Sequence, residues 1–261
     1  MPDTVRYDVA EGVATITMNR PESLNSLSRQ MKTDLLAVLR QARGDDGVRG
    51  VVLTGAGRAF CVGQDLREHA DTLAAGSGIG TTVREHYLPI ALEIATMPKP
   101  VVAAVNGMAA GAGAAFAFAA DFRLAADTAG FLMAFARVGL AADSGASWTL
   151  QRLVGYGRAS ALLMLAEPIA APAALEMGLV NAVVPVDDLA GATAELAAKL
   201  AAGPTAAYAG IKRQLAFAAT ADLPTALEYE AAEQERAGAT ADHRAATEAF
   251  VAKSTPSFQG R

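Results

Sequence analysis

Cysteine and histidine are scarce in this sequence, which excludes several kinds of protein. Cys61 is the one cysteine among 261 residues, so no internal disulfide can form, and we expect a reducing, cytoplasmic location. The three histidines, His69, His86 and His243, are too scattered to give a catalytic triad or metal-ligand spacing. We therefore expect no metal ion, and we expect each histidine to be a surface or packing side chain.

Positive charge and long apolar runs are also lacking. The formal net charge is −5 and no basic run occurs, which argues against nucleic acid as a partner. No stretch reaches about 18 apolar residues without a charge or a turn signal, so we expect no membrane span and no membrane partner. Residues 1–12 hold neither a basic region nor an apolar core, so we expect no signal peptide.

Three common catalytic motifs are missing. The chain has no Gly-x-Ser-x-Gly elbow of the serine hydrolases and no P-loop lysine for ATP. Gly55-Ala56-Gly57 follows an apolar strand as a dinucleotide fingerprint would, but its sixth position is Phe60 and no helix pattern follows. The ribose-binding acid expected about 20 residues further on is also absent.

Apolar residues, in contrast, make up 52% of the chain and supply a sizeable core. The most informative stretch is 99–121, which opens with a buried strand over 101–105. After Asn106-Gly107 breaks that strand, glycines lead into an Ala/Phe run over 114–120 that predicts a buried helix. A helix N-terminus behind bare backbone can hold negative charge, because its N–H groups are free and a ligand can come close. Tight packing with no ligand is the alternative.

The rest of the chain predicts an α/β core followed by helices. Residues 5–9 and 13–18 form an antiparallel hairpin, and strands near 51, 101 and 122 alternate with helices, which indicates parallel strands with crossover connections. The other elements expected in the core are a helix over 28–43 capped by Ser28, a mobile surface loop over 69–82, helices over 83–97, 131–135, from 146, over 156–166 and 171–178, and a strand over 181–185. Helices over 187–202, 205–219, 223–238 and 241–252 end the chain. Their apolar stripes suggest an assembly surface, so we divide the chain into a core with the active site (1–200) and a helical part (201–261).

Two glycine-rich turns follow parallel strands, one over 61–66 and the other over 110–113. Two backbone donors that converge on one oxygen are what a thioester carbonyl needs as it becomes an enolate. Losing one such donor typically costs about 10²–10³ in rate.

The sequence resembles the crotonase superfamily, also called the enoyl-CoA hydratase/isomerase family. The matching segments cover nearly the whole chain: 19–27 (NRPESLNSL), 55–66, 106–121, 131–153, 249–253 and 256–258. The resemblance implies an α/β fold, a crotonase-like spiral of ββα units with a C-terminal helical trimerisation domain. It also implies a homotrimer or a dimer of trimers, and a coenzyme A thioester as substrate with no other cofactor.

The resemblance further implies which residues form the site. The backbone N–H groups of Gln64 and Ala112 correspond to the family's oxyanion hole. The implied coenzyme A contacts are Ser23, Leu24, Ser26, Val62, Gly63, Asp65, Leu66, Arg67, Met108, Gly111, Ala115, Phe135 and, from a neighbouring subunit, Lys253. Of these, Arg67 and Lys253 would meet the phosphates.

The chain departs from the family's hydratases at two positions. Hydratases of the family use two glutamates, and the aligned residues here are Ala115 and Phe135. Because general acid–base catalysis is worth about 10²–10⁴ per group, we do not expect efficient hydration. Asp143 is the remaining acid in this neighbourhood, and burial would raise its pKa and make it a better base. The alternative is that Asp143 caps the helix that begins near Ala146.

Within the family, the pattern is similar to the ring-1,2-epoxyphenylacetyl-CoA isomerase type, on residues 61–65, 109–115, 131–135, 139–140 and 143. We therefore expect an acyl-CoA isomerase that moves a proton or double bond in an enoyl-CoA or ring-epoxide thioester. Asp143 would be the single base of this reaction, which would belong to fatty-acid or phenylacetate catabolism. The alternatives are an enoyl-CoA hydratase of fatty-acid or aromatic catabolism, and an acyl-CoA-binding protein without catalysis.

Overall fold

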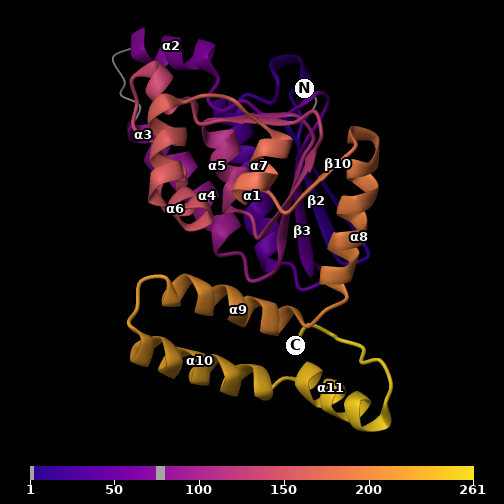
Figure 1. The fold of residues 1–261 in the computed structure, drawn as a ribbon. Helices are drawn as coiled ribbons and strands as arrows, with labels where there is room; N and C mark the ends of the chain where they lie inside the picture. The colour runs from indigo at the N-terminus through magenta and orange to yellow at the C-terminus, as the bar shows by residue number, and fades with distance from the viewer. Residues whose placement is uncertain (1–2, 75–79) are drawn as a thin grey trace.

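The computed structural model describes residues 3–74 and 80–261 of the chain. In this part of the chain, six strands form one sheet in the order β1-β2-β3-β5-β7-β10 (Figure 1). The hairpin strands β1 (Val5–Ala10) and β2 (Val13–Met18) are antiparallel, as predicted. The others pair in parallel with their neighbours: β3 (Gly50–Gly55), β5 (Val101–Val105), β7 (Phe122–Ala126) and β10 (Ala182–Val184).

A smaller sheet has the order β4-β6-β8-β9. Its strands are β4 (Ala59–Cys61), β6 (Met108–Ala110), β8 (Gly130–Leu132) and β9 (Ile169–Ala170). The chain repeatedly adds a strand to the large sheet, then a strand to the small sheet, then helix. This confirms the spiral of ββα units. The small strands were not predicted, because two or three residues are too few to show a strand periodicity.

The buried helix predicted after residue 113 is confirmed as α5 (Ala112–Ala119), which packs against α4 (Leu88–Ala95) and α6 (Ala146–Leu165). Every residue of β5 is buried, and so is nearly all of α5. Small side chains permit this close fit. A Cβ on Gly113 would lie 2.2 Å from the carbonyl oxygen of Cys61, so only glycine allows α5 to approach β4.

The helix predicted from Ser28 is confirmed as α1 (Arg29–Gly44). The Ser28 hydroxyl accepts the backbone N–H of Met31 at 3.2 Å, which is the expected N-cap bond. Met31, Leu35 and Leu39 form its buried stripe. Before α1 lies a short 3₁₀ turn, η1 (Pro21–Ser23).

The predicted mobile loop over 69–82 is wrong on both sides of residues 75–79, which lie outside the described part of the chain. α2 (Leu66–Ala74) is helical because the Asp65 carboxylate accepts the N–H groups of Arg67 and Glu68, at 3.2 and 3.4 Å. After the gap, α3 (Gly80–Thr82) and a π-helical turn, η2 (Val83–Tyr87), run directly into α4.

The helix predicted over 131–135 is also wrong. Phe131 lies in β8 and stacks on Phe118 of α5, with ring centroids 5.3 Å apart. A 3₁₀ helix, η3 (Ala134–Val138), follows it. The helices predicted from 146 and over 156–166 are the two halves of α6, which Gly155 interrupts with a φ of 77° and a ψ of 164°. α7 (Ala171–Met177) follows as predicted.

The C-terminal helices are confirmed where they were predicted. After a short turn, η4 (Val186–Asp188), the structure has α8 (Leu189–Ala201), α9 (Thr205–Ala218), α10 (Leu223–Gly238) and α11 (Ala241–Ala252). Figure 1 shows α8 against the large sheet and the other three in a layer of their own. That layer is tied to the core by the Lys212–Asp121 ion pair, at 2.7 Å, and by Arg49, which donates to the carbonyl of Phe258 at 2.8 Å. No helix in the described part of the chain combines the length and apolarity needed to cross a bilayer.

Candidate active site

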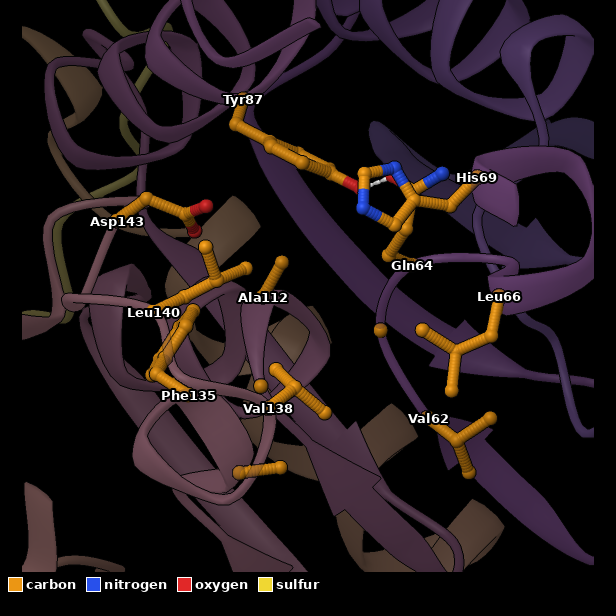
Figure 2. A pocket seen from close by; sticks show the side chains of 13 residues that line it. Val62, Gln64, Leu66, His69, Tyr87, Ala112, Phe135, Val138, Leu140 and Asp143 are labelled. Carbon is orange, nitrogen blue, oxygen red and sulfur yellow. Dashed lines mark hydrogen bonds between the residues drawn. The ribbon is translucent and has the colours of Figure 1, made fainter. Parts of the chain in front are cut away.

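A cavity of about 390 Å³ lies where the two glycine-rich turns meet (Figure 2). Most of its wall is apolar or backbone, and its polar side chains are Gln64, His69, Tyr87 and Asp143. The remaining lining residues are Val62, Gly63, Leu66, Gly111, Ala112, Ala134, Phe135, Val138 and Leu140. Such a lining, apolar with a few polar groups, suits a small organic ligand.

Gln64 and Ala112 present backbone N–H groups at this cavity. The backbone around Gln64 pairs with Leu27 through Gly63 and Asp65, which directs the N–H of Gln64 away from Leu27. Ala112 is the first residue of α5, where an N–H has no partner within the helix. Within residues 3–74 and 80–261, neither N–H has a protein acceptor.

Glycine is required where these two segments touch. Gly63 has a φ of +84°, and a Cβ there would lie 2.9 Å from the carbonyl oxygen of Ala110 and 3.5 Å from the nitrogen of Ala112. Gly111 has a φ of +52° and turns the chain from β6 into α5. Both glycines therefore hold the two N–H groups beside each other.

Asp143 supplies the carboxylate of the cavity. Burial raises the pKa of Asp143, while the Ser144 hydroxyl, which donates to it at 2.8 Å, acts in the opposite direction. The alternative that Asp143 caps α6 is wrong, because Gly145 occupies the cap and no side chain bonds there. Only the backbone carbonyl of Asp143 serves the helix, by accepting the N–H of Ala146 at 3.0 Å.

Tyr87 is a site residue that was not predicted from the sequence. This side chain is buried, lines the cavity, and donates its hydroxyl to the side-chain oxygen of Gln64. Burial, and next the charge of Asp143, raise the pKa of Tyr87 above its ordinary value. In Figure 2 the side chains of Tyr87 and Asp143 both point into the cavity. One buried helical stripe consists of Tyr87, Ile90 and Ile94. The position of Tyr87 at the start of this apolar stripe could have indicated a buried hydroxyl that needs a partner.

Other lining residues were also missed. His69, which was expected to be a surface or packing side chain, is half-buried and lines the cavity. His86 lies 3.3 Å from the Thr82 hydroxyl and outside the lining, and His243 is exposed on α11. Ala134, Val138 and Leu140 come from η3 and the loop after it, where the sequence has no strong pattern.

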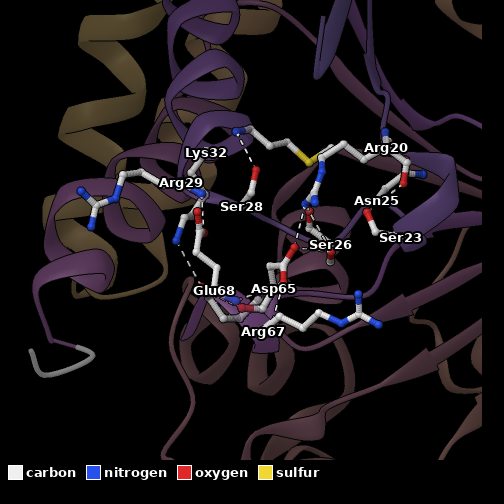
Figure 3. A network of polar contacts seen from close by, with 12 residues as sticks. Arg20, Ser23, Asn25, Ser26, Ser28, Arg29, Lys32, Asp65, Arg67 and Glu68 are labelled. Carbon is white, nitrogen blue, oxygen red and sulfur yellow. Dashed lines mark hydrogen bonds and ion pairs between the residues drawn. The ribbon is translucent and has the colours of Figure 1, made fainter. Parts of the chain in front are cut away.

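The residues expected at coenzyme A separate into groups. Val62, Gly63, Leu66, Gly111 and Phe135 line the cavity. Ser23, Ser26, Asp65 and Arg67 lie around a polar network beside it (Figure 3), and the Leu24 carbonyl accepts the N–H of Val62 at 3.3 Å. Met108 is partly exposed on β6, Ala115 is fully buried inside α5, and Lys253 ends α11 in the C-terminal layer.

The polar network fixes the loop between β2 and α1. The Asp65 carboxylate accepts from Arg20 at 3.0 Å and from Ser26 at 3.2 Å, and Arg20 also donates to the Ser26 carbonyl at 2.6 Å. Burial alone would raise the pKa of Asp65, but the bonds from Arg20, the Glu68 N–H and Ser26 outweigh it, so this pKa lies below the ordinary value. Asp65 is therefore a charged residue whose hydrogen bonds connect the loop around η1 to the start of α2.

A second cavity, of about 440 Å³, lies between α8 and the large sheet. The hydroxyl of Thr193 is buried in its lining without a partner in the described part of the chain. Its other polar lining residues are Glu11, Thr15, Thr54 and Asn106, and none of the predicted site residues reaches it. Among the described residues, no group of three or more His, Cys, Asp or Glu side chains is arranged to hold a metal ion.

Comparison with known proteins finds one family over nearly the whole chain. The family model "Enoyl-CoA hydratase/isomerase" matches residues 8–261. The chain is 45% identical over 258 residues to a "Probable enoyl-CoA hydratase" of Rhodobacter capsulatus, with 99% of this chain and 98% of the relative covered. It is 41% identical over 262 residues to the 1,2-epoxyphenylacetyl-CoA isomerase of Escherichia coli, with both chains fully covered.

A solved structure gives the same result. The crystal structure of an enoyl-CoA hydratase/isomerase from Cupriavidus metallidurans superimposes with a TM-score of 0.91 at 34% identity. The match covers 97% of this chain and 95% of that one. The chain belongs to the enoyl-CoA hydratase/isomerase family.

Proposed function

We propose that the protein is an acyl-CoA isomerase in which Asp143 is the single base. The observation that carries this proposal is one carboxylate in an apolar cavity that also holds the two free backbone N–H groups of Gln64 and Ala112. The two N–H groups would bind the thioester oxygen, and the acyl chain would extend toward Asp143. Backbone donors placed where charge develops stabilise an enolate without reorganising during the reaction.

The proposed reaction moves one proton. Asp143 removes a proton from C2 of a 3-enoyl-CoA, and the electron pair delocalises onto the thioester oxygen as a dienolate. The protonated carboxyl then returns the proton to C4, which leaves a conjugated 2-enoyl-CoA and regenerates the carboxylate. The raised pKa of Asp143 supports this role, because a base of higher pKa takes a carbon-bound proton more readily.

The two positions that carry glutamate in the family's hydratases support isomerisation over hydration. Ala115 is fully buried in α5, away from the cavity lining, and Phe135 faces the cavity with an apolar ring. Neither can hold or activate water. The 41% identical relative named 1,2-epoxyphenylacetyl-CoA isomerase supports a ring-epoxide thioester as an alternative acyl group.

The test uses purified protein and a 3-enoyl-CoA, with the conjugated thioester product followed by its absorbance. Wild type should form product. In Asp143→Asn, kcat should fall by a factor of about 10²–10⁴, which is the usual contribution of one acid–base group. Titration with an unreactive acyl-CoA should give the same affinity for both proteins. Full activity in Asp143→Asn would show that another group is the base.

The second candidate is an enoyl-CoA hydratase, which the name of the 45% identical relative favours. Asp143 alone would then activate the water. Rapid loss of conjugated absorbance when crotonyl-CoA is added, faster than any isomerisation of a 3-enoyl-CoA, would support hydration instead. Tight acyl-CoA binding without turnover of either compound would indicate a binding protein.

We also propose that the chain assembles as a homotrimer or a dimer of trimers through its C-terminal layer. Large apolar side chains are exposed there: Ile211, Leu215, Leu223, Leu227, Phe250 and Val251. Single exposed residues are ordinary, but six on three neighbouring helices make a surface that a partner copy can bury. Lys253 lies next to this surface, so a neighbouring copy would bring it to coenzyme A.

A further inference from the structure

Lys32 is a buried lysine beside the candidate site. It lies in the first turn of α1 and is only 3% exposed, although burying an ammonium group costs on the order of several kcal/mol. Burial lowers the pKa of Lys32, and the charges of Glu68 and Asp65 act against that shift. A charge kept inside the protein at this cost needs a reason in the contacts it makes.

The contacts of Lys32 converge on Gln64. Its ammonium donates to the Gln64 side-chain oxygen at 3.2 Å and to the Thr82 hydroxyl at 2.7 Å, and it lies 5.2 Å from the centre of the Tyr87 ring. The Tyr87 hydroxyl donates to the same Gln64 oxygen. One lysine thus connects α1, the segment before α2 and the segment after residue 79.

Gln64 takes part in this arrangement through both its side chain and its backbone. Its side chain accepts from Lys32 and Tyr87, while its backbone N–H is one of the two free donors at the cavity. Contacts that fix the side chain therefore help to hold the backbone of this donor in place. A positive charge that is buried behind the cavity wall also acts strongly on negative charge that develops nearby, because water screens it little.

We propose that Lys32 is a positioning residue of this site, which holds Gln64 in place and supplies a fixed positive charge beside the developing enolate. The proposal rests on the proposed enolate chemistry but not on which acyl-CoA reaction follows. It predicts that the neutral variant Lys32→Met lowers kcat for the 3-enoyl-CoA by about 10–100-fold, less than a direct donor would, and leaves KM within about threefold.

The decisive measurement uses acetoacetyl-CoA, whose enolate absorbs in the near ultraviolet and forms without turnover. The pH at which the bound compound ionises reports the charge stabilisation of the site directly. In Lys32→Met this apparent pKa should rise by about one unit, which is a tenfold loss of enolate stabilisation. Lys32→Arg keeps the positive charge and should retain most of the enolate stabilisation that wild type shows.

Lys99 provides a matched control in the same protein. It is also buried, but it donates to the carbonyls of Ala42 and Asp45, at 2.6 and 2.5 Å, at the opposite end of α1. Lys99→Met should lower stability, because it removes a donor from the Ala42 and Asp45 carbonyls at the end of α1, and should not change the ionisation of bound acetoacetyl-CoA. Lys32→Met should stay close to wild type in stability, because the Gln64 oxygen keeps the Tyr87 hydroxyl as its donor and an apolar side chain replaces a buried charge.

The outcomes separate the two proposals. If acetoacetyl-CoA ionises at the same pH in wild type and Lys32→Met, Lys32 has no electrostatic role and the inference is wrong. If the shift is seen but wild type isomerises no 3-enoyl-CoA, the inference stands and the isomerase assignment fails. If Lys32→Met and Lys32→Gln both fail to fold while Lys99→Met folds, Lys32 serves the fold rather than the site, which also overturns the proposal.

Discussion

Asp143 and Ser144 form a pair in which one hydroxyl tunes one carboxyl. Burial raises the pKa of Asp143, and the Ser144 hydroxyl, at 2.8 Å, holds that rise back. The serine adopts a left-handed conformation, with a φ of 54°, which is uncommon for a residue other than glycine, asparagine or aspartate. The Ser144 hydroxyl thus reaches the carboxylate from an uncommon backbone conformation.

Ser144→Ala should move the pH profile of the reaction. A base is active only when deprotonated, so kcat/KM falls as the pH drops through the pKa of Asp143. Removing the hydroxyl removes a favourable bond to the carboxylate and raises that pKa further, so the acid limb should shift to higher pH. An acid limb that stays where it is in wild type would show that the hydroxyl does not stabilise the charged carboxylate.

Asp143→Asn should raise stability at neutral pH while it removes activity. Because the folded-state pKa of Asp143 lies above its unfolded value of about 3.9, the charged carboxylate destabilises the fold, fully so above the folded-state pKa. Below about pH 3.9 the group is protonated in both states and the difference disappears. Thermal unfolding at neutral pH and near pH 3 measures this, and a lower Tm for the variant at neutral pH would contradict it.

At the scale of elements, two glycines define how close β4, β6 and α5 come to each other. A Cβ on Gly63 would lie 2.9 Å from the Ala110 carbonyl oxygen. It would also be strained by the φ of +84° at this position, which residues with a Cβ rarely adopt. A Cβ on Gly113 would meet the Cys61 carbonyl oxygen at 2.2 Å, deep in the core. The first contact lies in the cavity wall and the second lies behind it.

Gly63→Ala and Gly113→Ala should therefore fail differently. Gly113→Ala forces a buried helix away from a strand, so we expect a loss of stability at the upper end of about 1–3 kcal/mol for overpacking, or beyond it. Gly63→Ala should displace the N–H groups of Gln64 and Ala112 and lower kcat by about 10²–10³ in protein that remains folded. Denaturant unfolding and steady-state kinetics compare the two, and equal losses of stability would contradict this division.

The long elements were predictable and the short ones were not. α1, β5, α5 and the helices after residue 187 carry sustained periodicity or caps such as Ser28, so their positions follow from local sequence. The strands of the small sheet and η3 are too short for that, and their pairing depends on distant partners such as Phe118 with Phe131. The same limit applies to the cavity. The backbone turns at Gln64 and Ala112 were visible through glycines, whereas Tyr87 and Lys32 meet Gln64 only through tertiary structure.

At the scale of the molecule, the C-terminal layer presents apolar side chains that no residue of the described chain covers. Phe250 is 85% exposed and Leu215 is 70% exposed, on α11 and α9. Within the layer, Glu233 is buried between Arg213 and Arg236, at 2.6 and 2.5 Å, so α9 and α10 are held together without help from another copy. The layer is thus a formed surface available for assembly.

Phe250→Asp combined with Leu215→Asp should break the proposed assembly. A charge at each position would be buried on association, so the particle mass from light scattering should fall to that of one chain. Lys253→Met is the matched change beside the surface, and it should weaken coenzyme A binding while the assembly persists. An unchanged mass in the double variant would place the interface elsewhere.

The anchor between Arg49 and Phe258 has a consequence for how the chain folds during synthesis. Its donor and acceptor are 209 positions apart, and the Asp242 carboxylate fixes the neighbouring N–H groups of Gln259 and Gly260 at 2.5 and 2.8 Å. A contact between such distant positions closes a long loop, and the entropy cost of that closure has to be met before the contact contributes. Because Phe258 is translated 209 residues after Arg49, we expect the core around Arg49 to fold during synthesis before this contact closes.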